Sequence, residues 1–150
     1  MTYEQAYQRL LNHGNAVSSG GGDMPDEESF LFAVRKAEKD KSPPALKQLY
    51  DDILSCLEAV NRHLNGDRPS EGAAGENSQL DQSLVYSMWS ILHGGWEYHR
   101  RWELHGPFER PVRDELALTL WRISCAWGAV FDGDIDSLAG HVRDEEIARR

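Results

Sequence analysis

Hydrophobic residues recur along this chain at steps of three and four, which is the spacing of an amphipathic helix. The pattern predicts five main helices and a weaker C-terminal one, over residues 3–13, 25–41, 43–65, 80–104, 111–131 and 136–150. No alternating run bounded by turn residues predicts a strand. We therefore expect an all-α fold, a bundle of four to five main helices that spans residues 1–150 as a single domain.

Two polar, glycine-rich stretches interrupt the helical pattern. Residues 14–25 include three consecutive glycines, and residues 66–78 read GDRPSEGAAGENS without a hydrophobic anchor. Chains of this composition bury little hydrophobic area and stay flexible. We expect two flexible loops, the second of which is a mid-chain loop between an N-terminal and a C-terminal half of the domain.

The segment 43–65 carries the clearest helical pattern, with hydrophobic residues on one face and polar residues on the others. The hydrophobic residues are Leu46, Leu49, Tyr50, Ile53, Leu57, Val60 and Leu64. Asp51 and Asp52 lie on the other faces, where we expect them to be solvated. Ser42 is the expected N-cap of this helix, and Gly66 is its expected end.

Residues 80–104 predict a helix with a seam of coiled-coil type, in which hydrophobic positions alternate steps of four and three. The seam consists of Leu84, Met88, Ile91, Gly95, Tyr98 and Trp102. The pair Gly94–Gly95 lies within this segment, and each glycine weakens a helix by about 1 kcal/mol relative to alanine. The pair either kinks the helix, or admits a close neighbour, or breaks the segment into two helices.

The segment 111–131 is hydrophobic on two sides. One stripe consists of Leu116, Leu120, Ile123, Trp127 and Val130, and the second of Leu118, Trp121 and Cys125. A helix of this kind either lies in the centre of the core or shares one side with another chain. A structural or regulatory homodimer formed through residues 111–131 is therefore one interpretation of the sequence.

The chain is acidic, with 25 Asp and Glu against 16 Lys and Arg and a net charge of −9. Such a surface repels phosphate, which disfavours nucleic acids and anionic membranes as partners, and it suits a basic protein partner. The candidate partner-binding residues are Asp132, Asp134, Asp136, Asp144, Glu145 and Glu146. Trp121 and Trp127 are candidate aromatic anchors beside them. The alternative is that the acids are solvated and the tryptophans belong to the core.

The leading hypothesis is therefore an acidic interaction protein that binds a basic protein. It is analogous in size and charge to the immunity proteins and antitoxins that neutralise a toxin or nuclease. No apolar run approaches the roughly 18 residues of a membrane span, and the first residues lack the pattern of a signal peptide. Cys56 and Cys125 have neither a CxxC nor a zinc-type spacing. We expect a cytoplasmic protein without a cofactor.

The segment 93–105 is rich in chemically versatile side chains. His93 and Glu97 are four residues apart, as are His99 and Glu103, so each pair shares a helix face. A metal site needs three or four converging ligands, and the chain has neither an HExxH motif nor repeated ExxH motifs. These four residues are candidate metal ligands only as pairs, and hydrogen-bonded or solvated pairs are the expected outcome.

The same segment contains Arg100 and His105, which resemble the R-x4-H pattern of the HEPN nucleases, a family of small and often dimeric helical bundles. The resemblance covers the six residues from Arg100 to His105. It implies that these two side chains meet near a phosphate across a dimer and cleave RNA. No nucleophile elbow, glycine-rich phosphate loop or Cys–His arrangement supports another enzymatic class, so a binding role is favoured over catalysis.

Overall fold

A computed structural model describes residues 1–15, 28–66 and 81–132 of the chain. These residues fold into five helices and contain no strand, which confirms the predicted all-α bundle. The helices are α1 (Tyr3–His13), α2 (Phe30–Asp40), α3 (Leu46–Asn65), α4 (Gln82–His105) and α5 (Arg110–Asp132). The loops predicted over 14–25 and 66–78 and the weak helix predicted over 136–150 lie outside the described residues, except for Gly14, Asn15 and Gly66.

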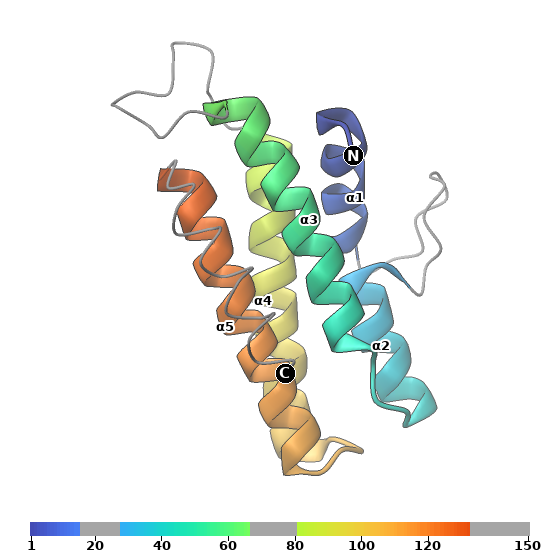
Figure 1. Cartoon of the computed structure of the whole chain (residues 1–150). Helices are drawn as coiled ribbons and strands as arrows, with labels where there is room; N and C mark the ends of the chain where they lie inside the picture. Colours follow the sequence, from blue (N-terminus) through green and yellow to red (C-terminus); the bar gives the residue numbers. More distant parts are fainter. Residues whose placement is uncertain (16–27, 67–80, 133–150) are drawn as a thin grey trace, which may run out of the picture.

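Figure 1 shows α3, α4 and α5 side by side, each running opposite to the one before it. The short helices α1 and α2 follow one another along the remaining edge of the bundle, so together they take the place of one long helix (Figure 1). α1 packs against α3 and α4, α2 packs against α4, and α5 packs against both α3 and α4. The result is a bundle with four helical positions that is built from five helices.

Two helices begin later than the sequence pattern predicted. α3 begins at Leu46 with Ala45 at the N-cap position, so the capping role predicted for Ser42 is wrong. The physical reason is Pro43–Pro44, because a proline disfavours the helical conformation in the residue before it. α2 begins at Phe30, and its start depends on contacts with the end of α1 that are described below.

The seam predicted on α4, here called the inner seam, lies in the centre of the core. Leu84, Met88, Ile91 and Trp102 are almost fully buried, and Tyr98 is partly buried against them. Burial of one such side chain stabilises the fold by about 1.5–3 kcal/mol. The alternation of four and three residues therefore identified the side of α4 that faces its neighbours.

α4 runs without interruption through Gly94–Gly95, so the alternative of a break into two helices is wrong. The alternative of a close neighbour is confirmed at both positions. A Cβ atom at position 94 would lie 2.9 Å from Leu31 Cδ2 on α2, and one at position 95 would overlap Leu120 on α5. The two glycines therefore let α2 and α5 pack closely on α4.

α5 buries one of its two hydrophobic stripes. Leu116, Leu120 and Ile123 are fully buried, whereas Leu118 and Trp121 of the second stripe face solvent. These two residues therefore lie outside the core formed by the described helices, while Cys125 of the same stripe is partly buried. Although α4 and α5 are long, no helix in the described part of the chain combines the length and the hydrophobicity of a membrane span.

Candidate interaction surface

Large hydrophobic side chains gather on the outward sides of α4 and α5. Tyr86, Trp89 and Trp96 of α4 are 66%, 54% and 42% exposed, and Leu118 and Trp121 of α5 are 46% and 59% exposed. We call these five residues the aromatic face. Burial of one aromatic side chain removes roughly 150–250 Å² of surface from water. The folded state therefore lacks a large stabilisation where several aromatic side chains stay exposed.

Helix geometry places the tryptophans of the aromatic face on the same side of the bundle. Gly95 of α4 and Leu120 of α5 face each other across the contact between the two helices. Trp96 and Trp121 each follow one of these residues, which corresponds to a rotation of about 100° around the helix axis. Because α4 and α5 run in opposite directions (Figure 1), the two rotations turn both side chains toward the same side. Trp89 precedes Trp96 by about two turns and points the same way.

The exposed aromatic residues of α4 belong to a regular series, which we call the outer seam. Its members are all exposed and alternate steps of three and four: Tyr86, Trp89, His93, Trp96, Arg100 and Glu103. Neighbouring rings touch, with the Tyr86 and Trp89 centroids 5.9 Å apart and Trp89 stacked on His93 at 4.5 Å and an interplanar angle of 8°. α4 therefore has coiled-coil spacing on its outer side as well as on its inner side.

The net charge of −9 resides mostly outside the described helices. The described residues include 14 acidic and 12 basic side chains, a net charge of −2, which leaves −7 for the other 44 residues. The helical body is therefore close to neutral. The acidic character that the composition indicated belongs mainly to the segments 16–27, 67–80 and 133–150.

The predicted partner-binding acids begin where α5 ends. Asp132 is the last residue of α5, and the others lie outside the described residues, namely Asp134, Asp136, Asp144, Glu145 and Glu146. Of the two predicted aromatic anchors, Trp121 is exposed, whereas Trp127 packs against the core. Trp121 therefore remains a candidate anchor, and the core alternative applies to Trp127.

The candidate metal ligands on α4 have separate neighbours. His93 stacks on Trp89, Glu97 is exposed, and His99 Nδ1 lies 3.8 Å from Glu103 Oε1. Among the described residues, no three His, Cys, Asp or Glu side chains converge in a way that could hold a metal ion. The four candidates therefore form pairs at most, fewer ligands than a zinc site needs.

Arg100 and His105 project from α4 in directions about 140° apart, because they are five residues apart on one continuous helix. Their meeting, as the resemblance to HEPN nucleases implies, would require a second chain. Arg101 instead shares a side of α4 with His105, and both line an open pocket of about 520 Å³ together with Glu38 and Lys41. Glu38 forms an ion pair with Arg101, so this guanidinium group already has an anionic partner within the chain.

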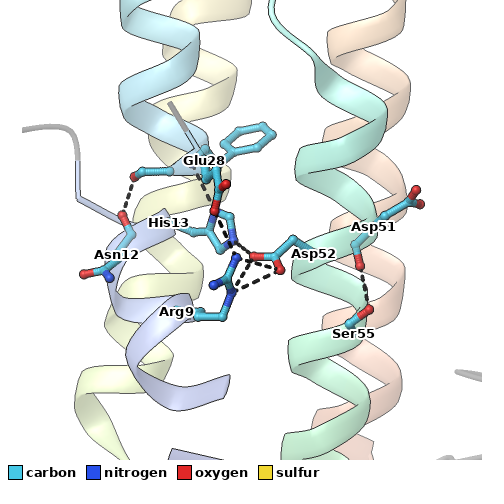
Figure 2. A network of polar contacts seen from close by, with 9 residues as sticks. Arg9, Asn12, His13, Glu28, Asp51, Asp52 and Ser55 are labelled. Carbon is cyan, nitrogen blue, oxygen red and sulfur yellow. Dashed lines mark hydrogen bonds and ion pairs between the residues drawn. The ribbon is translucent and has the colours of Figure 1, made fainter. Parts of the chain in front are cut away.

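A polar network that the sequence pattern did not indicate joins α1, α2 and α3 (Figure 2). His13 is fully buried at the end of α1. Its Nε2 lies 2.7 Å from Asp52 Oδ2 on α3, and its Nδ1 accepts a 3.0 Å hydrogen bond from the Phe30 N–H at the start of α2. Arg9 Nε donates to both oxygens of Asp52, at 3.1 and 3.0 Å. The prediction that Asp52 is solvated is therefore wrong.

These contacts determine the charge states in the network. Nδ1 of His13 accepts a hydrogen bond, so in the neutral ring the proton resides on Nε2 and is donated to Asp52. Burial lowers the pKa of His13, although the hydrogen bond to Asp52 opposes this effect. Burial also opposes the ionisation of Asp52, but hydrogen bonds from His13 and Arg9 outweigh it and lower the pKa of that carboxyl group. His13 is thus neutral and Asp52 ionised at neutral pH.

The network connects helices, and its histidine is not arranged to act as a general base. A general base needs a free lone pair, and the Phe30 N–H occupies the one that the neutral His13 ring offers. His13 in this way caps the first turn of α2, where an N–H group has no partner within the helix. The Ser29 hydroxyl donates in return to the carbonyl oxygen of Asn12 near the end of α1. The end of α1 and the start of α2 therefore satisfy each other's polar groups.

The environment of Cys56 makes its thiol unreactive. Both cysteines are free, with Cys56 buried and Cys125 partly buried. Burial raises the pKa of the Cys56 thiol to about 12. Because the thiolate is the nucleophile, a thiol in this state is inert.

The chain matches no protein-family model, no curated protein and no solved structure at a significant level. Its class is therefore defined by the helices themselves, as an all-α bundle with a near-neutral body and an exposed aromatic face.

Proposed function

We propose that this chain is an interaction protein that binds a basic protein partner through the aromatic face of α4 and α5. The observation that carries the proposal is the exposure of Trp89, Trp96 and Trp121 on one side of the bundle. Contiguous exposed hydrophobic surface typically marks a binding site, and tryptophan and tyrosine are enriched among the residues that dominate binding energies.

The distribution of charge supports a basic partner. Of the six candidate acids, Asp132 ends α5, the helix that carries Trp121, and the other five follow it in the chain. Most of the net charge lies in the segments outside the described helices. Attraction between these acids and a basic protein speeds encounter, while the aromatic face supplies the close contacts. Neutralisation of a basic toxin or nuclease, in the manner of an immunity protein or antitoxin, is the role we favour by analogy of size and charge. The free cysteines suit the reducing cytoplasm as the compartment of this interaction.

Affinity capture tests this proposal. The immobilised full chain is incubated with a lysate of its native host at low and at high salt, and bound proteins are identified by mass spectrometry. We expect to recover more of a basic protein after incubation at low salt than at high salt, because salt screens attraction beyond about 8–10 Å.

Two variants make the assay specific for the aromatic face. The double variant Trp89→Ala/Trp121→Ala should lose capture, since truncation of an aromatic anchor typically costs about 2 kcal/mol or more. Lys47→Ala, at an exposed position on α3, is the control and should retain the partner. Recovery of no basic protein at low salt, or equal recovery by the double variant, contradicts the proposal.

A further inference from the structure

The outer seam of α4 has the spacing of a helix surface that packs against another helix. Its six residues alternate steps of three and four over a length of about 26 Å. The inner seam of the same helix has the same alternation and is filled by neighbouring helices. On the outer seam, Tyr86, Trp89 and Trp96 remain exposed among the described residues. The outer seam therefore fits one further helix.

The chemistry of the outer seam changes along its length. Its N-terminal end carries Tyr86 and Trp89, and its C-terminal end carries Arg100 and Glu103. If a second copy of α4 ran parallel, each charged residue would face its own copy, and like charges in direct contact repel. If the second copy runs antiparallel, each aromatic residue faces a different kind of group.

Antiparallel pairing gives three complementary contacts. Tyr86 lies opposite Glu103 of the second copy, Trp89 opposite Arg100, and His93 opposite Trp96. A tyrosine hydroxyl donates to a carboxylate, and a guanidinium group is attracted to the face of a tryptophan ring. Stacking of His93 on a tryptophan ring already occurs within one chain, where its partner is Trp89. The pairs are symmetric about a point between positions 94 and 95, so one surface serves both copies, as a two-fold axis requires.

The charge of the described helices offers little repulsion between two copies. The described helices carry a net charge of only −2, and Arg100 and Glu103 compensate each other within the seam. Trp121 of α5 is exposed on the same side as Trp96 and extends the contact beyond α4.

We infer that a second copy of this chain covers the aromatic face when the partner is absent, through antiparallel packing of α4 along its outer seam. The inference rests on the proposed function, because it states how access to the same face is regulated. Self-association and partner binding exclude each other, so the partner binds the monomer.

Sedimentation velocity of the purified full chain, with no other protein present, tests the pairing. We expect a monomer–dimer equilibrium at micromolar concentrations. Arg100→Glu should weaken the dimer about tenfold or more, because it replaces the cation that faces Trp89 with an acid. Lys47→Glu makes the same change of charge on α3 and should leave the equilibrium nearly unchanged. A monomer at every concentration, or a dimer that Arg100→Glu leaves intact, overturns the inference.

A distance between spin labels tests the orientation. Labels are attached at Gln82→Cys in a Cys125→Ser background, at the exposed N-terminal end of α4. Antiparallel pairing places the two labels about 38 Å apart along the helix axis, whereas parallel pairing brings them within about 10 Å. The shorter distance overturns the inference. A monomer that still captures the basic partner would overturn the self-association alone, so failure of this inference is distinguishable from failure of the proposed function.

Discussion

His13 connects three helices at one point. One ring nitrogen faces Asp52 on α3, the other accepts the N–H of Phe30 in α2, and the residue itself ends α1. The side chain is fully buried, so its removal leaves the Phe30 N–H without a hydrogen-bond partner. A single substitution at this position therefore affects the contacts of α1 with both α2 and α3.

Replacement of His13 by alanine is expected to lower the free energy of unfolding by about 2–4 kcal/mol. The substitution leaves the Phe30 N–H without a partner, removes one donor to Asp52 and opens a cavity. Urea unfolding followed by circular dichroism near neutral pH measures the change. His105→Ala, at an exposed position, is the control and should change the free energy of unfolding by less than about 0.5 kcal/mol. Equal effects of the two substitutions would contradict the structural role of His13.

Mild acid is expected to destabilise the fold through the same residue. Burial lowers the pKa of His13 from its ordinary value of 6.5, so below that pH the unfolded chain binds a proton that the folded chain does not. The stabilisation is complete above pH 6.5 and is lost as the pH falls toward the lowered pKa of the folded state. Asp52, with a pKa lowered from 3.8, adds a second loss only below that value.

Urea unfolding of the wild type and of His13→Gln at a series of pH values measures this dependence. The free energy of unfolding of the wild type should decline between neutral pH and about pH 5. The decline should be smaller in His13→Gln, because glutamine does not titrate in this range. Parallel pH profiles of the two proteins would show that His13 is not the responsible group.

The sequence could not have predicted the polar network around His13. Periodicity places position 13 at the end of a helix, but the partners of His13 are 17 and 39 residues away in the chain, at Phe30 and Asp52. Hydrophobic spacing within one helix carries no information about polar pairs between helices. Asp52 occupies the polar side of α3 in the pattern, and the packing of α1 against that side leaves it only partly exposed.

Among the helices, α4 has the most consequential packing, because it contacts α1, α2 and α5. Gly95→Ala is expected to destabilise the fold by about 1–3 kcal/mol, despite the better helix propensity of alanine, since the new Cβ would overlap the fully buried Leu120. Gly94→Ala should cost less, because its Cβ meets the end of the Leu31 side chain at 2.9 Å. Thermal unfolding of both variants measures the difference. A stabilising effect of Gly95→Ala would show that α4 and α5 are farther apart than described.

The helices themselves were largely predictable, because their hydrophobic residues follow the period of the helix. The inner seam of α4 and the buried stripe of α5 both lie where their spacing placed them. The start of α3 was not predicted, because Ser42 has the chemistry of a cap but lies before Pro43–Pro44. Spacing alone also could not decide between a break at Gly94–Gly95 and a close contact, which depends on Leu120 of another helix.

Hydrophobic spacing indicated the part of the aromatic face on α5 but not the part on α4. The stripe that contains Trp121 was recognised because α5 has two hydrophobic sides, although spacing does not reveal what covers the second one. Trp89 and Trp96 were not singled out, because the outer seam of α4 is interleaved with the inner seam. It becomes visible once the inner seam is assigned to the core and the remaining 3–4 series is seen to face solvent.

At the scale of the whole molecule, charge and hydrophobic contact are divided between different parts of the chain. The described helices have a net charge of −2 and carry the aromatic face, whereas the remaining segments carry −7. Long-range attraction and short-range contact therefore involve different residues. Salt should mainly affect how fast a basic partner associates, and substitutions on the aromatic face should mainly affect how long it stays bound.

Hydroxyl-radical footprinting with and without the captured partner tests the central claim, that the aromatic face is the docking surface. In the dilute free chain, Trp89, Trp96 and Trp121 should be modified, whereas the buried Trp102 should not. In the complex, the three exposed tryptophans should become protected, while the exposed Met1 stays reactive as an internal control. Tryptophans that remain equally reactive in the complex would contradict the account.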